Sequence, residues 1–529
     1  MFLKKVLALA LGLALGLGLP AAAQGNLTVD DTVHYGGTGN DQYRAAVRVP
    51  GGTIAVGQSD STDVDLAGMD RGEFDAIIVK YSDNGDVVWK HNFGGSAEDY
   101  FRGIALAPDG VLAVGYSNST DGDLAGLNKG SWDAVLVKYD FDGNLQWNRN
   151  FGGSYTDYFF SAAAVDDGFL LVGQSSSTNQ DLAGCNKGGF DATVAKYSFD
   201  GALQWNRNFG GSALDRFYFV APVDGGFLAA GNSASNDQDL AGQNLGLQDA
   251  VLARYDSAGS LVWNVNYGSS RNDYFYTCLP TGTGFAAAGS TEDPAGNTGP
   301  DAALVQYDGN GRVLWERQFG GSANDYFYGL VPTPTGLLAT GTSNSVNGDL
   351  QGLNRGSSDA VFAQYSPAGE LLWNENFGGS NFDCFYTVLP AAQGYAAAGY
   401  STSRDQQLQG LNFGRQDAIF TRLRIPFAAV VRYSTTAPTP GPVTATLVAT
   451  EPIETPAGWT KINGTTFTKQ YTQNANEQLT LTAVADQKQI TVTVSVDNIT
   501  APDPRVPLVW LLAAVLLLAL VLMLLCCGC

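Results

Sequence analysis

Residues 93–151 read FGGSAEDYFRGIALAPDGVLAVGYSNSTDGDLAGLNKGSWDAVLVKYDFDGNLQWNRNF, and this stretch decides the fold because the chain repeats it. An aromatic residue followed by Gly, then Gly or Ser, then Ser or Thr recurs seven times, at intervals of 58 residues except for one of 52. The repeats begin at Tyr35, Phe93, Phe151, Phe209, Tyr267, Phe319 and Phe377. A period this regular predicts one supersecondary unit copied seven times, each copy packing on its neighbours.

Each copy divides into four strand-like segments. In the second repeat they are 101–107, 111–116, 134–139 and 145–151. The second and third segments are continuously apolar, as strands covered on both faces are. The fourth alternates, with Leu145, Trp147 and Phe151 on one face, which predicts a half-exposed outer edge. Four antiparallel strands per repeat are one blade, so the sequence predicts an all-β, seven-bladed β-propeller over residues 24–426.

The seventh copy lacks its fourth strand, because the repeat stops near Leu423. We expect the missing strand in residues 25–34, where Gly25-Asn26-Leu27 repeats the Gly-Asn-Leu that opens the outer strand of the second copy. In this alignment Val29 takes the place of Trp147, and a bulge absorbs a two-residue difference in spacing. The N-terminal strand would then close the ring of blades.

The two ends of the chain predict export and membrane anchoring. Residues 1–23 combine two lysines, an apolar run and a small-residue cleavage site, which is typical of a secretory signal peptide. Residues 506–525 are uncharged, apolar and long enough for one transmembrane helix. A Pro-rich linker, 500–505, precedes this segment, and a short Cys-rich tail, 526–529, follows it. The sequence predicts an exported single-pass membrane protein with its N-terminal ectodomain outside the cytoplasm; a C-terminal segment processed after export is the alternative.

The repeat resembles those of secreted bacterial β-propeller proteins, which carry FGGSxxDYF, DGDLAG and DxxGxLxW segments. This resemblance covers residues 25–426 and implies the fold and a bacterial cell surface. It implies no ligand, because propellers host many unrelated functions.

Residues 427–499 form a second predicted domain, a small β-sandwich, because runs such as 443–447 and 490–494 alternate apolar and polar residues. The segments Tyr433-Ser434-Thr435-Thr436 and Gly458-Trp459-Thr460 resemble bacterial Ig-like surface modules. The resemblance implies an order of binding head, stalk and membrane.

The net charge of −22 makes nucleic acid a poor partner for this surface. The sequence holds two histidines and no GxSxG, HExxH or P-loop motif. Two aspartates recur in every copy, represented by Asp99 and Asp133 in the second, and we expect them to accept hydrogen bonds from loop backbone.

The long loops between the second and third strands carry aspartates that are not required in every copy. We predict these carboxylates as the ligand-binding residues: Asp63, Asp65, Asp121, Asp123, Asp181, Asp237, Asp239 and Asp349. Asp121 and Asp123 begin like an EF-hand loop, but Ala125 and Trp132 stand where oxygen ligands are needed. Calcium at Asp121 and Asp123 is therefore an alternative to a turn-forming role, and no other cofactor is expected.

The sequence predicts a non-enzymatic recognition or adhesion protein whose propeller binds an extracellular protein or glycan. An exported carbohydrate-active hydrolase and a structural surface-layer component are the alternatives. The sameness of the copies argues against the hydrolase, because catalysis needs unlike residues that converge at one point.

Overall fold

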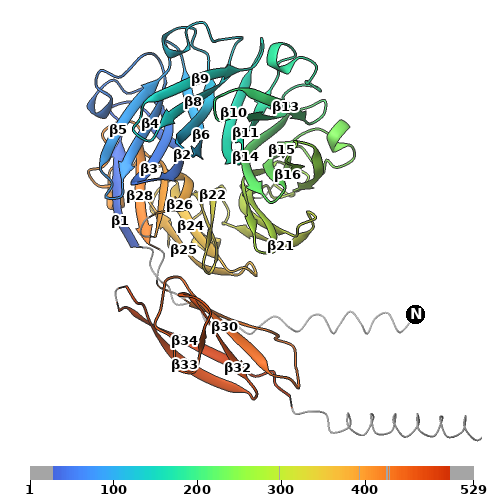
Figure 1. Ribbon diagram of the computed structural model, residues 1–529. Helices are drawn as coiled ribbons and strands as arrows, with labels where there is room; N and C mark the ends of the chain where they lie inside the picture. The colour runs from blue at the N-terminus through green and yellow to red at the C-terminus, as the bar shows by residue number, and fades with distance from the viewer. Residues whose placement is uncertain are drawn as a thin grey trace, which may run out of the picture. The chain divides into compact units, whose positions relative to one another are not determined.

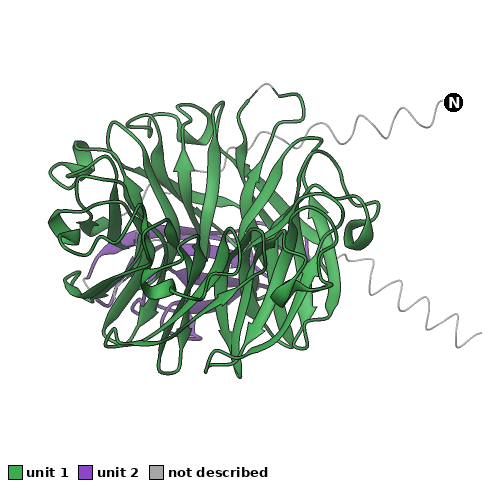
Figure 2. Cartoon of the chain, turned by 90° about the horizontal axis from the view of Figure 1, so that it is seen from above, with its two compact units in different colours: residues 1–425 green, residues 426–529 purple. Residues whose placement is uncertain are grey.

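The computed structural model describes residues 28–296, 298–391, 394–424, 427, 429–485 and 487–500. The predicted signal peptide 1–23, the apolar segment 506–525 and the tail 526–529 lie outside the described residues. Within the described ranges, no helix is long and apolar enough to cross a membrane. The chain divides after residue 425 into two compact units, which Figure 2 colours separately.

Unit 1 is all-β and consists of propeller-like, repeated four-stranded antiparallel sheets, seven of them among the described residues. Six sheets contain consecutive strands: β2 (Asp41–Val49), β3 (Gly52–Ser59), β4 (Asp75–Ser82), β5 (Val87–Phe93); β6 (Asp99–Ala107), β7 (Gly110–Ser117), β8 (Asp133–Asp140), β9 (Leu145–Phe151); β10 (Asp157–Val165), β11 (Gly168–Ser175), β12 (Asp191–Tyr197), β13 (Leu203–Phe209); β14 (Asp215–Val223), β15 (Gly226–Ser233), β16 (Asp249–Asp256), β17 (Leu261–Tyr267); β18 (Asp273–Thr281), β19 (Gly284–Thr291), β20 (Asp301–Tyr307), β21 (Val313–Phe319); β22 (Asp325–Thr333), β23 (Gly336–Ser343), β24 (Asp359–Tyr365), β25 (Leu371–Phe377).

The remaining sheet joins the two ends of unit 1: β26 (Asp383–Pro390), β27 (Tyr395–Ser401), β28 (Asp417–Arg424) and β1 (Thr28–Tyr35). The first strand of each repeat is innermost and the fourth lies at the rim, as the labelled β2, β6 and β9 show in Figure 1. The loops after the second strands hold short 3₁₀ helices: η1 (Val64–Leu66), η2 (Gly122–Leu124), η3 (Gln180–Leu182), η4 (Gln238–Leu240), η5 (Gly348–Leu350) and η6 (Gln406–Leu408).

The four strands predicted for the second repeat are confirmed as β6 to β9. Every residue of β7 is buried, because neighbouring sheets cover both of its faces. The outer strand β9 is half-exposed as expected, but Leu145 does not face the core with Trp147; it is 49% exposed. The cause is a β-bulge at Gln146, since Lys138 pairs with Trp147 and Tyr139 pairs with Leu145.

Outer-strand tryptophans such as Trp89 and Trp147 dock on the hairpin of the next repeat. The indole Nε1 of Trp89 donates to the carbonyl of Phe141 at 3.1 Å. Gly143 follows in this hairpin with φ +89°, and a Cβ there would come within 2.8 Å of the Trp89 ring. Glycine is therefore required both by the backbone conformation and by the close approach of the indole.

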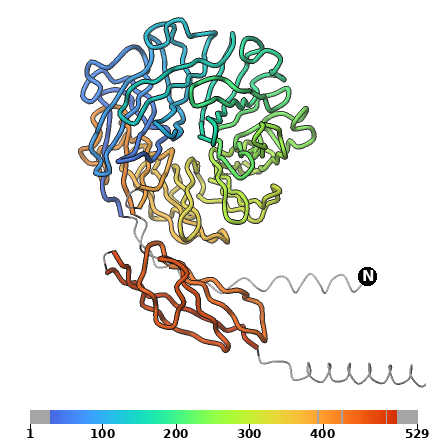
Figure 3. The backbone as a smooth tube through the Cα atoms, in the orientation of Figure 1, coloured from blue at the N-terminus to red at the C-terminus, as the bar shows by residue number. Residues whose placement is uncertain are grey.

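Strand β1 forms the fourth strand of the last sheet, but its register differs from the expected one. Tyr35 pairs with Ala418 and Asp31 stands opposite Arg422, so Asp31, and not Val29, takes the place of the docking tryptophan. A bulge falls between Val29 and Asp31, and Val29 pairs with Leu423. The register of β1 is set by the number of residues that precede Tyr35, the aromatic residue of the Gly-rich turn. The sequence match at residues 25–27 is therefore misleading. In Figure 3 the blue start and the orange end of unit 1 lie side by side.

Unit 2 contains a four-stranded sheet and a two-stranded sheet around one hydrophobic core. The larger sheet has the order β29 (Ala429–Tyr433), β30 (Val443–Ala449), β32 (Thr466–Tyr471), β31 (Thr460–Lys461), and the smaller one pairs β33 (Ala475–Thr482) with β34 (Gln489–Val496). Trp459 and Phe467 from one part and Leu481 and Val494 from the other are buried in this core. The Ig-like assignment of unit 2 stays a prediction.

Candidate functional site

The aspartate that opens each inner strand is a structural acceptor. In the second repeat, buried Asp99 Oδ2 accepts the Gly95 amide at 2.8 Å and the Ser119 hydroxyl at 2.8 Å. Asp157 and Asp215 accept the same bonds in the next two repeats. Burial raises the pKa of the equivalent Asp41 and Asp383 to about 6, because the folded protein removes each carboxylate from water. The predicted structural role of these residues is confirmed.

The aspartate that opens each third strand has a similar role. Asp249 Oδ2 accepts the Leu245 amide at 2.7 Å and the Asn266 side-chain amide at 2.9 Å. In Asp249 and in Asp301 of the shortened fifth repeat alike, Oδ1 is buried without a hydrogen-bond partner among the described residues. Burial raises the pKa of Asp301 to about 6.

The first set of predicted loop carboxylates caps the Gly-rich turn that precedes the same repeat's inner strand. Asp121 Oδ1 accepts the Ser96 amide at 2.7 Å, and this bond lowers the pKa of the carboxyl. Asp63 and Asp237 accept the equivalent amides at 2.8 Å. In the third and sixth repeats Asn179 and Asn347 supply the same acceptor at 2.9 Å. A neutral amide oxygen is thus sufficient at this position.

The second set of loop carboxylates accepts the first amide of the Gly-rich turn. Asp181 and Asp239 accept the Gly152 and Gly210 amides at 3.0 Å, and Asp65, Asp123 and Asp349 make the same bond at 3.1–3.3 Å. Three of them also pair with a cation of the preceding repeat: Arg71 with Asp123, Lys129 with Asp181, and Lys187 with Asp239. These pairs join neighbouring repeats along the long-loop face.

The Asp-Gly-Asp-Leu segment therefore has a structural explanation. Gly122 adopts φ +58°, and buried Leu124 anchors the loop in the core. Across the described residues, no group of three or more His, Cys, Asp or Glu side chains is arranged to hold a metal ion. The loops and the Gly-rich turns share one face, as expected, but a ligand role for the eight loop aspartates stays a prediction.

A different set of side chains comes from the innermost strands of unit 1, each from a β-bulge. The pairing of every first strand with its second skips one residue at the same place, nine residues after the aromatic of the turn. We call the bulged residues the inner ring: Arg44, Arg102, Phe160, Tyr218, Tyr276, Tyr328 and Tyr386. Bulges re-aim side chains, and they are common next to functional sites.

Contacts follow the inner ring from repeat to repeat. The aromatic centroids of consecutive members lie 5.1–5.5 Å apart from Phe160 through Tyr386. The Arg44 guanidinium then lies 4.2 Å from the Tyr386 centroid, which links the first repeat to the seventh. Arg102 lies 5.1 Å from the Tyr116 centroid, and Tyr116 contacts Phe160 at 6.4 Å. All seven members are half-buried.

The two ring arginines sit in an unusual electrostatic setting. Burial, and secondarily the positive charge of Arg44, lower the pKa of the Arg102 guanidinium. Among the described residues, no carboxylate forms an ion pair with either arginine. The buried Nε of Arg44 has no hydrogen-bond partner in the described part of the chain, and neither does Nε of Arg216, two residues before a ring position.

Sequence reasoning missed the inner ring because it assigned ligand binding to the variable long loops and did not compare inner-strand positions from copy to copy. The ring position is Arg, Arg, Phe, Tyr, Tyr, Tyr and Tyr in successive repeats, whereas the flanking aspartate and aromatic residues barely change. A variable position inside an otherwise constant strand is the signal that could have found it.

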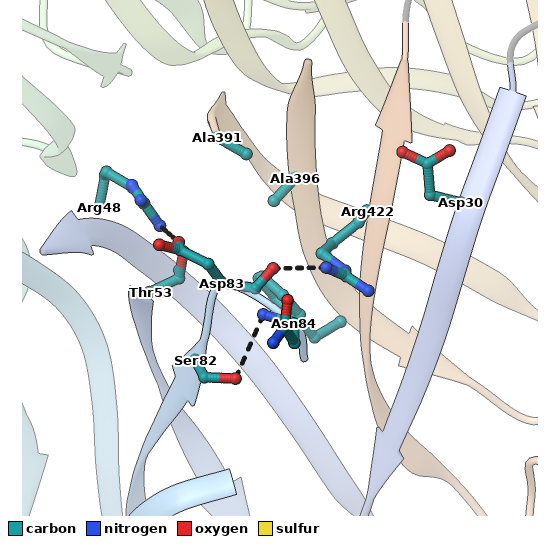
Figure 4. Close-up of a pocket in the computed structure, with 10 residues that line it drawn as sticks. Asp30, Arg48, Thr53, Ser82, Asp83, Asn84, Ala391, Ala396 and Arg422 are labelled. Carbon is teal, nitrogen blue, oxygen red and sulfur yellow. Dashed lines mark hydrogen bonds and ion pairs between the residues drawn. The ribbon is translucent and has the colours of Figure 1, made fainter. Parts of the chain in front are cut away.

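A polar hollow of about 190 Å³ lies at the seam between the first and last sheets (Figure 4). Arg48 pairs with the Asp83 carboxylate, and Arg422 donates to the Asp83 carbonyl. Arg422 also pairs with Asp31 at 3.1 Å. These charges are used to hold the seam together, so the hollow is a weaker candidate than the inner ring.

The repeated sheets and their innermost strands define a β-propeller-like protein. No family model matches the chain. It is 26% identical over 355 residues to the Regulatory protein FlaEY of Caulobacter vibrioides, which is 62% of this chain and 35% of that protein. The chain therefore spans about a third of the length of this relative.

Solved structures similar to the chain include the WD40 β-propeller domain of Doa1, with 12% identity, a TM-score of 0.41 and coverage of 75% of this chain and 97% of that one. A europium-containing methanol dehydrogenase has 10% identity and a TM-score of 0.37, covering 75% and 93% of the two chains. Structural similarities at these TM-scores do not indicate what this chain binds or does.

Proposed function

We propose that unit 1 is a closed seven-bladed β-propeller and that the protein is a non-enzymatic recognition or adhesion protein at a bacterial cell surface. Its ligand is an extracellular protein or glycan, bound without chemistry. The observation that carries this proposal is the variation of the inner ring within an otherwise constant frame. Such variation turns seven similar repeats into one asymmetric surface, which recognition of a specific ligand requires.

The position of the carboxylates favours recognition over a hydrolase. Glycoside hydrolysis needs a pair of carboxyl groups that flank the scissile bond. The inner ring consists of two arginines and five aromatic residues. The carboxylate oxygens of the loop aspartates accept hydrogen bonds from backbone amides such as those of Ser96 and Gly152. The ring therefore offers groups that bind and orient a ligand but no acid and base pair.

The proposed surface location rests on the apolar segments at the two ends of the sequence. In this proposal unit 2 is an Ig-like stalk, and residues 506–525 form the membrane anchor. A protease added to intact cells should release one fragment that contains both units, by cutting near residues 500–505. Full protection in intact cells combined with release after lysis would contradict the orientation.

The binding function can be tested with the purified full-length chain on glycan and protein arrays. We expect retention of a restricted set of ligands, each recovered with its mass unchanged after prolonged incubation. Conversion of a retained ligand to a product of different mass would show an enzyme. Retention of no ligand at all would favour a structural surface-layer component.

A further inference from the structure

The two ring arginines are half-buried cations in an acidic protein. The chain has 51 Asp and Glu against 29 Lys and Arg, and some arginines of unit 1 pair with carboxylates, as Arg71 does with Asp123. Others, such as Arg149 and Arg207, stack on outer-strand tryptophans. Arg44 and Arg102 occupy the same position in consecutive repeats and lack a carboxylate partner among the described residues. A half-buried charge without a counterion is costly to the fold, so an external anion is the natural complement.

The surroundings hold the guanidinium groups in place without neutralising them. Arg102 Nε donates to the Tyr116 hydroxyl at 3.0 Å, and its Cζ lies 5.3 Å from the Tyr100 centroid. Arg44 stacks over Tyr386, and its buried Nε has no partner in the described part of the chain. A guanidinium has five N–H donors, so both groups retain donors that a carboxylate can accept in pairs.

The neighbours of these arginines suit a sugar more than a peptide side chain or a polyanion. Tyr116 is buried, and the half-buried rings of Tyr158 and Trp132 pack on it with centroids 4.0 Å and 5.6 Å away. The site therefore combines flat apolar faces with phenolic hydroxyls, which both donate and accept hydrogen bonds as sugar hydroxyls require. The net charge of −22 repels polyanions, so a ligand with an isolated carboxylate is favoured.

We propose that Arg44 and Arg102 bind the carboxylate of an acidic sugar of the uronic acid class, with the adjoining tyrosines contacting the sugar ring. This inference rests on the proposed recognition function. It adds the chemical class of the ligand and the residues that bind it.

Calorimetric titration of the full-length chain with methyl glucuronoside tests the inference, with methyl glucoside as the neutral probe and acetate as the bare carboxylate. We expect binding of the glucuronoside at least about tenfold tighter than that of either other probe, because one lost charge-assisted pair is worth about a factor of ten. Arg44→Gln and Arg102→Gln should each weaken glucuronoside binding by about tenfold or more.

Arg149→Gln and Arg207→Gln are the matched controls, because these arginines stack on Trp147 and Trp205 of the outer strands. They should leave the affinity within about twofold, and thermal melting should show that all four variants fold. Equal binding of glucoside and glucuronoside, or of acetate and glucuronoside, would overturn the inference. So would unchanged affinity in both ring variants, or preference for an acidic peptide in a parallel titration.

The failure of this inference and the failure of the proposed function have different signatures. Array ligands that bind equally well to Arg44→Gln and Arg102→Gln would remove the carboxylate site and leave the recognition function intact. Cleavage of the glucuronoside with retained dependence on both arginines would support the site and contradict a non-enzymatic function.

Discussion

The Asp31 carboxylate lies 3.1 Å from the Arg422 guanidinium, across 391 residues of sequence. This ion pair takes the place that Trp147 and Lys138 occupy in the sheet of the second repeat. It joins the first described strand to the last strand of the repeat region. The stability of unit 1 should therefore depend on β1.

Val33 on β1 tests this dependence, because it packs against the core shared by the first and last sheets. Val33→Asp should lower the free energy of unfolding by about 1–3 kcal/mol, since it places a charge against apolar side chains. Val88→Asp, on the equivalent outer strand β5, should have little effect because Val88 is 54% exposed. Denaturant unfolding followed by light scattering measures both. Equal stability of the two variants would mean that β1 is not part of the cooperative unit.

The two classes of aspartate should respond differently to substitution. Asp99→Ala leaves the Gly95 amide and the Ser119 hydroxyl without their buried acceptor, at a cost of about 1–3 kcal/mol per group. Asp121→Asn keeps the acceptor for the Ser96 amide, as Asn179 does for Ser154, and should change stability by less than about 0.5 kcal/mol. Chemical denaturation compares the two, and a larger loss for Asp121→Asn would reverse the assigned roles.

Unit 1 should become more stable as the medium turns mildly acidic. Burial raises the pKa of Asp41, Asp75, Asp133 and Asp383 to about 6, whereas an Asp in an unfolded chain has a pKa of about 3.9. Because the folded state binds these protons more tightly, their contribution is fully present below about pH 4 and is lost as the pH rises through about 6. The midpoint of thermal unfolding should therefore increase as the pH falls from about 7.5 to about 5.

Asp301→Asn provides an internal comparison for this pH dependence. The variant removes a charge that is partly buried without a partner for Oδ1, so it should raise the melting midpoint at neutral pH and reduce its rise on acidification. A midpoint that falls between about pH 7.5 and about pH 5 in the parent protein would contradict the raised pKa values.

The strands of unit 1 were predictable because their signals are local. Turn residues and apolar runs placed the second repeat's strands within two residues of the observed ends, as 101–107 compared with Asp99–Ala107 shows. The register of β1 was not predictable from residues 25–27, because it depends on pairing with Arg422 at the far end of the repeats. The inner ring was missed for a related reason: the sequence shows only that the position of Arg102 varies between copies, and the bulge there arises when β6 pairs with β7.

We expect Arg102 to lower the free energy of unfolding of the protein. It is a desolvated cation near Arg44, without a carboxylate partner among the described residues, so Arg102→Gln should raise the free energy of unfolding by about 0.5–2 kcal/mol. The outer-strand variant Arg149→Gln should be neutral or slightly destabilising, because Arg149 stacks on Trp147 in a more exposed position. Loss of stability in Arg102→Gln would indicate that the arginine serves the fold and not a ligand.

The most direct test of the recognition account is a crystal structure of the full-length chain with methyl glucuronoside bound. The account predicts the sugar on the axis of unit 1, with its carboxylate within hydrogen-bond distance of the Arg44 and Arg102 guanidinium groups and its ring against Tyr100 or Tyr386. Density for the sugar at the Asp121 and Asp123 loop, at the hollow beside Asp83, or nowhere on the chain would contradict it.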